Sequence, residues 1–267
     1  MTDSVDSIPR QAWCIGLDTQ VKQPVRLAKP VMRGTGPYQG LPLGGFGAGG
    51  IGRSYRGGFG RWTVKAGAMK DFCLPGNMFC VRTATADADP RAVALHPGVP
   101  TQSPDAPKPG NALSAWNWHY GGKGATYHAL FPKAWYHYPA GEDLEVDLLC
   151  EQFSPVLPGQ YRETSLPVGV FRWTLSNPGD RPVDVSLMFS FVNMTGWFDD
   201  FGHGMPAGKS GDNENRPVDE PGLRGVVMER AARDIPLKEG DGQFCIAARP
   251  DDGLELSTCA AFSCNGD

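Results

Sequence analysis

The segment from Leu41 to Trp62 constrains the fold more than any other part of the chain, because it is dominated by glycine. Glycine weakens helix interiors and adopts backbone conformations that other residues avoid, so such a run favours turns and short strands. The whole chain shares this tendency, since its 35 glycines and 24 prolines exceed average usage. The composition therefore predicts an all-β fold with many loops.

The clearest strands lie on either side of the turn Asn177-Pro178-Gly179-Asp180. Apolar and polar residues alternate from Val168 to Leu175 and again from Val183 to Phe191. An alternation of period two places one set of side chains on each face of a strand. Two such segments joined by a Pro-Gly turn predict an antiparallel hairpin with one buried face.

The rest of the chain predicts further strands joined by long loops. Strands are expected at residues 144–151, 225–228, 243–248 and 254–263. Residues 86–114 are rich in proline and residues 201–222 are polar, so both segments are predicted to be surface loops. Neither an amphipathic helix nor an internal repeat is evident. We therefore expect residues 1–267 to form a single domain, a large antiparallel β-sandwich.

The glycine-rich segment contains a literal G-x-G-x-x-G match from Gly45 to Gly50, with Asp71 downstream. A dinucleotide site also needs a strand before the glycines and a helix after them. Residues 32–42 are interrupted by glycine and proline, and residues 53–58 cannot sustain a helix. The sequence therefore argues against nucleotide binding. The nearby Arg56-Gly57-Gly58-Phe59 is a single copy, whereas RNA-binding segments of this type are repeated, so we predict a tight hairpin instead.

Charge and targeting features exclude several classes of partner. The net charge of −4 argues against nucleic acid and anionic membranes. Residues 1–11 lack the apolar run of a secretory signal, and no transmembrane segment is predicted. The sequon at Asn193 is for this reason not interpreted as a glycosylation site. Seven scattered cysteines without a C-x-x-C pair indicate neither zinc nor a disulfide framework, so the expected location is cytoplasmic.

The residues alone do not nominate a catalytic site. Glycosidases need two carboxylates flanking a sugar, but the acidic residues from Glu142 to Glu151 mostly share the polar face of one strand. Asp199 and Asp200 lie in a more suggestive aromatic context, which a loop cap explains equally well. The five histidines show no metal-binding spacing, so no metal or cofactor is expected. The aromatic region 116–138 is interpreted as core or interdomain surface, with stacking on a sugar as the alternative.

The last residues of the sequence resemble the middle of a domain. Cys264-Asn265-Gly266-Asp267 follows an apolar, strand-like run, and Asn-Gly-Asp is typical of a turn into another strand. We therefore expect the sequence to be a fragment of a longer protein. An ordinary terminus with a short polar tail is the alternative.

Two long motifs resemble a known family. The first runs from Gly40 to Arg53 and continues from Tyr55 to Trp62. The second begins at Phe153-Ser154-Pro155-Val156, includes Ser165 to Phe171, and continues from Asn177 to Ser190. Both are similar to the N-terminal domain of glycoside hydrolase family 116, which includes non-lysosomal glucosylceramidases and bile acid β-glucosidases. Gly58 departs from the pattern, which has a polar or acidic residue there.

The resemblance implies a two-domain retaining β-glucosidase, with an N-terminal β-sandwich and a C-terminal (α/α)6 barrel. The catalytic Glu and Asp belong to the barrel, which no segment of this chain matches. The chain alone is therefore expected to be inactive, and its partners to be the barrel of the same polypeptide and a β-glucoside substrate.

The resemblance also suggests that the glycine-rich hairpin reaches towards the barrel. The residues expected at the domain interface or substrate rim are Arg53, Arg56, Phe59, Arg61 and Trp62. The alternative function is a free-standing, non-catalytic β-sandwich that binds carbohydrate or protein.

Overall fold

In the structure, a computed structural model, the regular secondary structure is almost entirely antiparallel strand, as the composition predicts. It describes residues 4–20, 40–64, 69–71, 73–98, 113, 116–195, 213–230, 242–249 and 253–262. The chain divides into two compact units. The first contains residues 1–103 and 116–190, and the second contains residues 104–115 and 191–267. Each is described by itself.

Five of the described strands form the main sheet of the first unit, in the order β1-β8-β9-β10-β11. Their bounds are β1 Trp13–Gly16, β8 Thr126–Leu130, β9 Lys133–Tyr138, β10 Asp147–Phe153 and β11 Val170–Ser176. All four pairings are antiparallel. One face of this sheet carries Tyr136, Tyr138 and Leu148, which are fully buried. This face belongs to the core.

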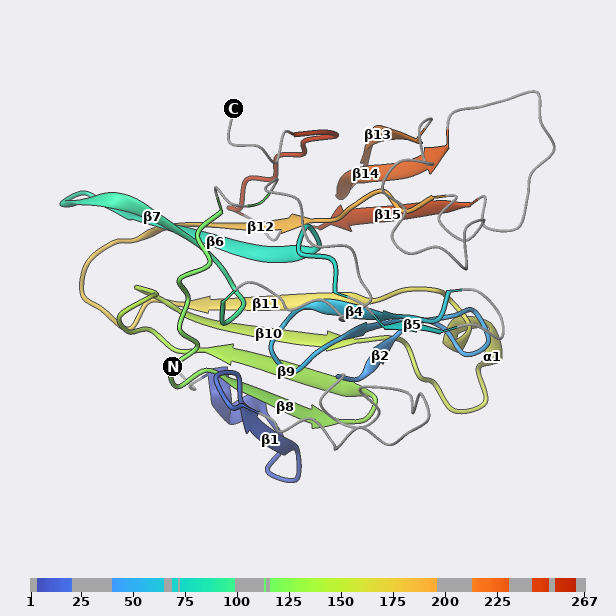
Figure 1. The fold of residues 1–267 in the computed structure, drawn as a ribbon, viewed down its shortest axis with the longest axis horizontal. Helices are drawn as coiled ribbons and strands as arrows, with labels where there is room; N and C mark the ends of the chain where they lie inside the picture. Colours follow the sequence, from blue (N-terminus) through green and yellow to red (C-terminus); the bar gives the residue numbers. More distant parts are fainter. Residues whose placement is uncertain are drawn as a thin grey trace, which may run out of the picture. The chain divides into compact units, whose positions relative to one another are not determined.

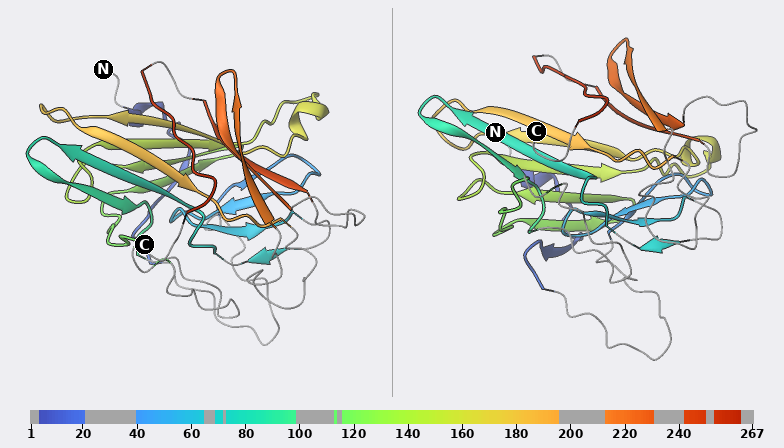
Figure 2. Two further views of the ribbon diagram at one scale, coloured as in Figure 1. Left: turned by 90° about the horizontal axis from the view of Figure 1, so that it is seen from above. Right: turned by 45° about the horizontal axis from the view of Figure 1, so that its top comes forward.

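A three-stranded sheet covers that inner face (Figure 1). It consists of β6 Met78–Thr85, β7 Ala88–Ala94 and β12 Asp184–Ser190, with β6 in the centre. The two further views in Figure 2 show the same two layers. Aromatic rings fill the space between the layers: Phe79 lies 4.9 Å from Trp173 and 5.2 Å from Phe171 between ring centroids. The predicted sandwich is confirmed.

The predicted hairpin around Asn177–Asp180 is wrong, although both of its strands exist. β11 pairs with β10 in the main sheet, whereas β12 pairs with β6 in the covering sheet. The turn therefore carries the chain from one layer to the other. The physical reason is that both strands have an aromatic face. Crossing between layers brings Phe171 and Phe189 to 5.7 Å across the core, which pairing side by side in one sheet would not do.

The glycine-rich segment forms a small four-stranded sheet in the first unit, in the order β2-β3-β4-β5. Its strands are β2 Pro42–Leu43, β3 Ile51–Arg53, β4 Phe59–Trp62 and β5 Lys70–Asp71. β3 and β4 form the predicted tight hairpin, with Gly57 in the left-handed region at φ 102°. The glycines of the G-x-G-x-x-G match lead into β3, a strand, rather than into the helix that a nucleotide site requires.

The N-terminal residues cover the outer face of the main sheet. The short 3-10 helix η1 Ser4–Ser7 is followed by Ile8, which packs against Trp135 and Leu149. These two side chains point away from the inner core, so without this segment they would be exposed to water. The outer face of the sheet is thus partly covered by the chain's own N-terminal residues.

The second unit contains a three-stranded antiparallel sheet in the order β13-β14-β15. The strands are β13 Asn213–Glu220, β14 Leu223–Arg230 and β15 Gln243–Ala248. The Asn193 side chain, from the sequon, is engaged here: its amide nitrogen donates to Asn215 Oδ1 at 2.8 Å and to the Glu214 carbonyl at 3.1 Å. Asn193 is therefore part of the packing within this unit.

Three predictions about local structure need correction. β7 lies within the predicted loop 86–114, and β13 lies within the predicted loop 201–222. Residues 254–262 contain no strand, although a strand was expected at 254–263. Both unexpected strands lie at the edge of a sheet and contain proline, Pro90 and Pro217, which edge strands tolerate. The described part of the chain includes one short α-helix, α1 Tyr161–Thr164.

Candidate functional site

The turn between β2 and β3, residues 44–50, is held in place by side chains from the main sheet. Ser154, which directly follows β10, accepts a hydrogen bond of 2.7 Å from the Gly44 amide through its hydroxyl group. The same hydroxyl donates at 2.6 Å to the carbonyl of Val168. One serine therefore fixes the start of the glycine-rich turn to the segment that leads into β11.

Backbone segments approach this turn so closely that only glycine fits at Gly45. A Cβ atom at this position would lie 2.2 Å from the Ser165 carbonyl oxygen, just after α1. The next residue, Phe46, donates from its amide to the Thr164 carbonyl at 3.0 Å. Glycine thus permits the backbone contact that joins the turn to α1.

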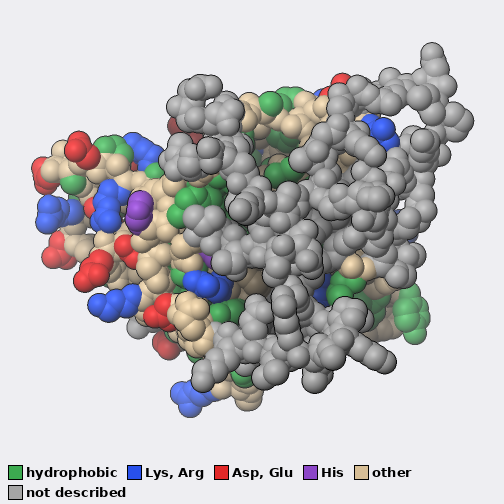
Figure 3. Space-filling model, viewed as in Figure 1, with side chains coloured by type: hydrophobic (Ala, Val, Ile, Leu, Met, Phe, Trp, Pro, Cys, Tyr) green, Lys and Arg blue, Asp and Glu red, His purple; other side chains and the backbone are tan. Residues whose placement is uncertain are grey.

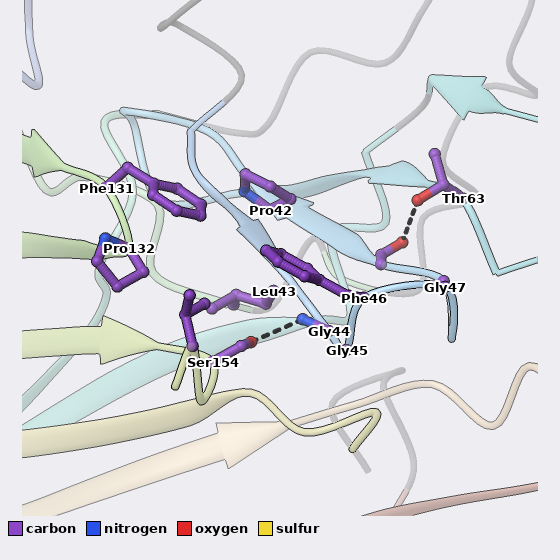
Figure 4. Close-up of a pocket in the computed structure, with 13 residues that line it drawn as sticks. Pro42, Leu43, Gly44, Gly45, Phe46, Gly47, Thr63, Phe131, Pro132 and Ser154 are labelled. Atoms are coloured by element: carbon purple, nitrogen blue, oxygen red, sulfur yellow. Dashed lines mark hydrogen bonds between the residues drawn. The ribbon is translucent and has the colours of Figure 1, made fainter. Parts of the chain in front are cut away.

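A small pocket lies beside this turn, with a volume of about 230 Å³ (Figure 4). Its lining comes from β2 and the turn after it (residues 42–47, 49 and 50) and from the β8–β9 turn (Phe131 and Pro132). Thr63, Ser154 and Val156 complete it. Phe46 and Phe131 are more than half exposed, at 57% and 58%. Figure 4 shows these two rings on the same side of Leu43, with Pro132 beside it. The pocket is thus a small, mostly apolar hollow with two exposed aromatic rings.

The chemistry of this pocket is that of binding rather than of catalysis. Among the described residues that line it, there is no carboxylate, histidine or cysteine that could act as acid, base or nucleophile. The two hydroxyl groups are already engaged, Ser154 as described and Thr63 by donating to the Gly50 carbonyl at 3.0 Å. Such a pocket selects for an apolar group.

Arg53, one of the five predicted site residues, is fully buried and not at a surface. Its Nε donates to the Gly57 carbonyl at 3.1 Å, one Nη donates to the Tyr138 hydroxyl at 3.1 Å, and the other to Gln152 Oε1 at 3.4 Å. The guanidinium carbon lies 4.0 Å from the centre of the Tyr136 ring. Arg53 therefore ties the β3–β4 hairpin to the inner face of the main sheet.

The groups around the Arg53 guanidinium are neutral. Burial raises the pKa of Tyr138 to about 12 and that of Cys150 to about 11, although the Arg53 cation opposes both shifts. The phenol and the thiol therefore stay protonated near neutral pH. The cation is stabilised by hydrogen bonds to neutral groups and by the faces of aromatic rings rather than by a carboxylate.

Two other predicted site residues, Phe59 and Trp62, are also buried. Phe59 lies 5.7 Å from Phe189 and 5.9 Å from Phe171 between ring centroids, so it extends the aromatic core between the layers. Together with Arg53, these residues hold the hairpin in place. A direct contact with another domain would need them to become exposed.

The last two predicted site residues, Arg56 and Arg61, are partly exposed. Arg56 donates to the Pro97 carbonyl at 2.6 Å and belongs to the tight β3–β4 turn. Next to it lies His96, which is buried and whose Nδ1 is 2.7 Å from the Gly98 carbonyl. Burial, reinforced by the Arg56 and Arg53 cations, lowers the pKa of His96 to about 4. The structure thus separates the five residues into three buried supports and two that reach the surface.

The sequence reasoning did not select the pocket residues Phe46 and Phe131. A signal was available for both, since each aromatic side chain is placed within a turn, Phe46 between glycines and Phe131 before a proline. Aromatic residues are uncommon in tight turns unless they contact something outside them. The aspartates Asp199 and Asp200 lie outside the described residues.

Among the described residues, no group of three or more His, Cys, Asp or Glu side chains is placed to hold a metal ion. None of the described helices is long and apolar enough to cross a membrane.

A comparison with protein-family models matches residues 40–267. The matching family is described as β-glucosidase 2, glycosyl hydrolase family 116, N-terminal domain. The match begins at the glycine-rich segment and includes both units, while η1 and β1 precede it.

Proposed function

The chain belongs to the N-terminal domains of glycosyl hydrolase family 116. We propose that it packs against the catalytic barrel of a β-glucosidase and helps to shape the active site of that barrel. The observation that carries this proposal is the family match, which extends over residues 40–267. The reaction proposed for the whole polypeptide is hydrolysis of a β-glucoside, with glucosylceramide as one candidate substrate.

In this proposal the chain supplies no catalytic carboxylate. A retaining glycosidase needs an acid and a nucleophile about 5 Å apart, one on each side of the scissile bond. The pocket beside the glycine-rich turn is lined by glycine, proline and apolar residues, with two hydroxyl groups. This composition supports a role in contact with a partner rather than in bond cleavage.

The proposal is tested by comparing the 267-residue chain with a longer polypeptide that carries the barrel. We expect the longer polypeptide to hydrolyse an aryl β-glucoside and the 267-residue chain to show no turnover. We also expect the chain, when added to a separately produced barrel, to bind it and to raise its activity. Turnover by the chain alone, or failure to bind the barrel, would contradict the proposal.

We assign the substrate rim to Arg56 and Arg61, held in position by the buried Arg53, Phe59 and Trp62. Support comes from the partial exposure of the two arginines on a hairpin that is anchored in the core, Arg56 in its turn and Arg61 on β4. The test is the double substitution R56A/R61A in the longer polypeptide, with exposed R172A as the control. We expect a raised KM or weaker domain docking. Wild-type kinetics and melting in the double variant would rule this role out.

A cytoplasmic location is part of the same proposal. All six cysteines that the structure describes are free thiols, which suits a reducing compartment. Cell fractionation with an antibody against the chain tests it, and recovery in the secreted fraction would overturn it.

One observation favours the alternative of a free-standing carbohydrate-binding domain. Trp116 and Trp118 stack with ring centroids 5.8 Å apart and planes at 20°, and both are partly exposed. Flat, paired indole rings offer a surface on which a sugar ring can stack. Titration of the 267-residue chain with gluco-oligosaccharides, followed by tryptophan fluorescence, distinguishes the two functions. Saturable binding that is lost in W118A would favour this alternative.

A further inference from the structure

Exposed apolar side chains gather around the pocket at one end of the first unit. They come from the glycine-rich turn, the β8–β9 turn and the segment around α1, and we call them the apolar end: Phe46, Phe131, Leu157, Tyr161, Leu166 and Val168. Tyr161 is the most exposed, at 82%. Figure 3 shows hydrophobic side chains at the side where α1 lies in Figure 1. Monomeric proteins rarely expose so many large apolar groups together unless the surface binds a partner.

Hydrogen bonds tie most of the apolar end into one surface. Thr164 accepts from the Phe46 amide through its carbonyl oxygen, and its hydroxyl group accepts from the Leu157 amide at 3.0 Å. The Val168 amide donates to the Leu166 carbonyl, and Val168 is in turn joined to Ser154 in the pocket lining. The contributing segments are therefore fixed relative to one another, and the surface is preorganised for binding.

The apolar end has little unbalanced charge. Lys133, two residues from Phe131, is paired with Glu151 at 2.6 Å, and Arg172 contacts the other oxygen of the same carboxylate at 3.1 Å. α1 contributes one residue of each sign, Arg162 and Glu163. By contrast, charged side chains gather at the other end of the first unit, where the turn between β6 and β7 lies (Figures 1 and 3). A surface of this kind complements an uncharged apolar partner.

We propose that the apolar end is the surface on which the catalytic domain of the same polypeptide docks, and that the pocket receives one aliphatic or aromatic side chain from that domain. This inference rests on the proposed function and adds the location of the contact. Phe46 and Phe131 flank the inserted side chain, and Tyr161, Leu157 and Leu166 extend the contact around it. The interface is centred on the glycine-rich turn of residues 44–50 rather than on the β3–β4 hairpin.

The pocket fits a protein side chain better than a glycan. Its volume of about 230 Å³ is below the roughly 300 Å³ at which pockets for small-molecule ligands begin. A sugar also needs hydrogen-bond partners, whereas the Ser154 hydroxyl both accepts and donates within the chain and the Thr63 hydroxyl already donates its hydrogen to the Gly50 carbonyl.

A folded protein is also favoured over a lipid bilayer. Surfaces that insert into membranes combine apolar side chains with lysine and arginine that are free to meet anionic headgroups. Here Lys133 and Arg172 are both bound to Glu151, and the exposed Arg162 of α1 is followed directly by Glu163, so the described cations of this surface do not form a free cluster. The hollow between Phe46 and Phe131 is concave, and a concave site fits an inserted side chain rather than the interior of a bilayer.

Hydrogen–deuterium exchange of the 267-residue chain and of the longer polypeptide tests the location directly. We expect at least tenfold slower exchange at residues 43–50 and 156–168 in the longer polypeptide, with β12 unchanged. Protection that appears only elsewhere, for example at residues 54–61, would overturn the location but leave domain docking intact. An absence of added protection anywhere would overturn both the location and the proposed function.

Substitutions in the longer polypeptide provide an independent test. F46D/F131D places two carboxylates at the pocket, and we expect it to separate the unfolding of the two domains into two transitions. M188D is the matched control, because Met188 is 43% exposed on the outer side of β12 and distant in sequence from the apolar end. Identical melting of F46D/F131D and M188D, with circular dichroism showing both folded, would overturn the proposal. Should F46D/F131D not fold, the exchange experiment on the unsubstituted protein still decides the question.

Discussion

The guanidinium carbon of Arg53 lies 4.0 Å from the centre of the Tyr136 ring, and the Tyr136 hydroxyl donates a hydrogen bond of 2.9 Å to the Arg53 carbonyl. The two residues therefore contact each other through both side chain and backbone. The Ser54 carbonyl lies 2.8 Å from the same hydroxyl and shares its single hydrogen. This pair connects the β3–β4 hairpin to the centre of the main sheet, and it makes the position of the hairpin depend on one buried cation.

Substitution R53K tests this dependence. Lysine keeps the charge but lacks the planar fork that reaches Gly57, Tyr138 and Gln152 together, so buried acceptors lose their donors. We expect the free energy of unfolding to fall by about 2–4 kcal/mol in urea denaturation. The control R172K, at an exposed ion pair with Glu151, should change it by about 0.5 kcal/mol or less. A loss below about 1 kcal/mol in R53K would show that the fork geometry is not required.

Substitution G45A tests the close contact between the glycine-rich turn and α1. The added methyl group would meet the Ser165 backbone at 2.2 Å, so one of the two segments must move. We expect a loss of about 1–3 kcal/mol in thermal or urea unfolding. G141A is the control, because a Cβ at Gly141 meets nothing within 4 Å. Alanine there should change stability by less than about 1 kcal/mol, in the stabilising direction. Equal stability of the two variants would contradict the contact.

Local sequence patterns determine where strands lie, but not which strands pair. The alternation from Val168 to Phe191 correctly identified β11 and β12, because period two reports which side chains share a face. It did not identify their partners, since a buried aromatic face fits pairing within a sheet and crossing between sheets equally well. Contacts distant in sequence, such as Phe79 with Phe171 and Phe189, decide between the two.

Edge strands gave no usable pattern for a different reason. Residues 88–92 of β7 are exposed on both faces, so their polarity is that of a loop. β13 is similar, with no fully buried residue. Residues 254–262 present the opposite case, in which Leu254 and Phe262 suggested a strand but are 64% and 50% exposed. Strand formation depends here on a neighbouring strand rather than on the side chains.

The candidate site was located by sequence only in part. The glycine-rich segment was correctly selected, because glycine marks close backbone approach. The burial of Arg53 was not foreseen, since an arginine among glycines suggests an exposed hairpin. Its hydrogen-bond partners Tyr138 and Gln152 come from strands more than 80 residues away in sequence, and no local pattern connects them to it.

Substitution N193D tests the polar network of the second unit. The Asn193 amide nitrogen donates to Asn215 Oδ1 and the Glu214 carbonyl, so the aspartate oxygen that replaces it would face these acceptors, while the other oxygen could still accept from the Thr195 amide, as Asn193 Oδ1 does at 3.0 Å. We expect a loss of about 2–3 kcal/mol and faster hydrogen exchange in β13 and β14. N177D is the control, because it also removes an amide donor, from the Asn177 bond of 2.6 Å to the Arg181 carbonyl, but does so in an exposed turn where water can replace it. Unchanged exchange in N193D would contradict the network.

The buried His96 predicts how stability depends on pH. Burial lowers the pKa of its imidazole from 6.5 to about 4 in the folded chain, with Arg56 and Arg53 acting in the same direction. Between these two values the unfolded chain binds a proton at this residue and the folded chain does not. The unfolded state therefore holds more protons, and the free energy of unfolding falls as the pH is lowered through this window.

The contribution of His96 is fully present above pH 6.5, and its loss by pH 4 amounts to about 3 kcal/mol. Urea denaturation of the wild type and of H96Q at several pH values between 4 and 7.5 measures it. We expect a shallower pH dependence in H96Q, whatever its stability at neutral pH, because glutamine cannot take up the proton. Some dependence should remain, since burial also lowers the pKa of His128 and His137. Parallel profiles for the two proteins would show that His96 has the same pKa in the folded and unfolded chain, and hence that the environment formed by Arg56, Gly98 and the β3–β4 turn is open to water.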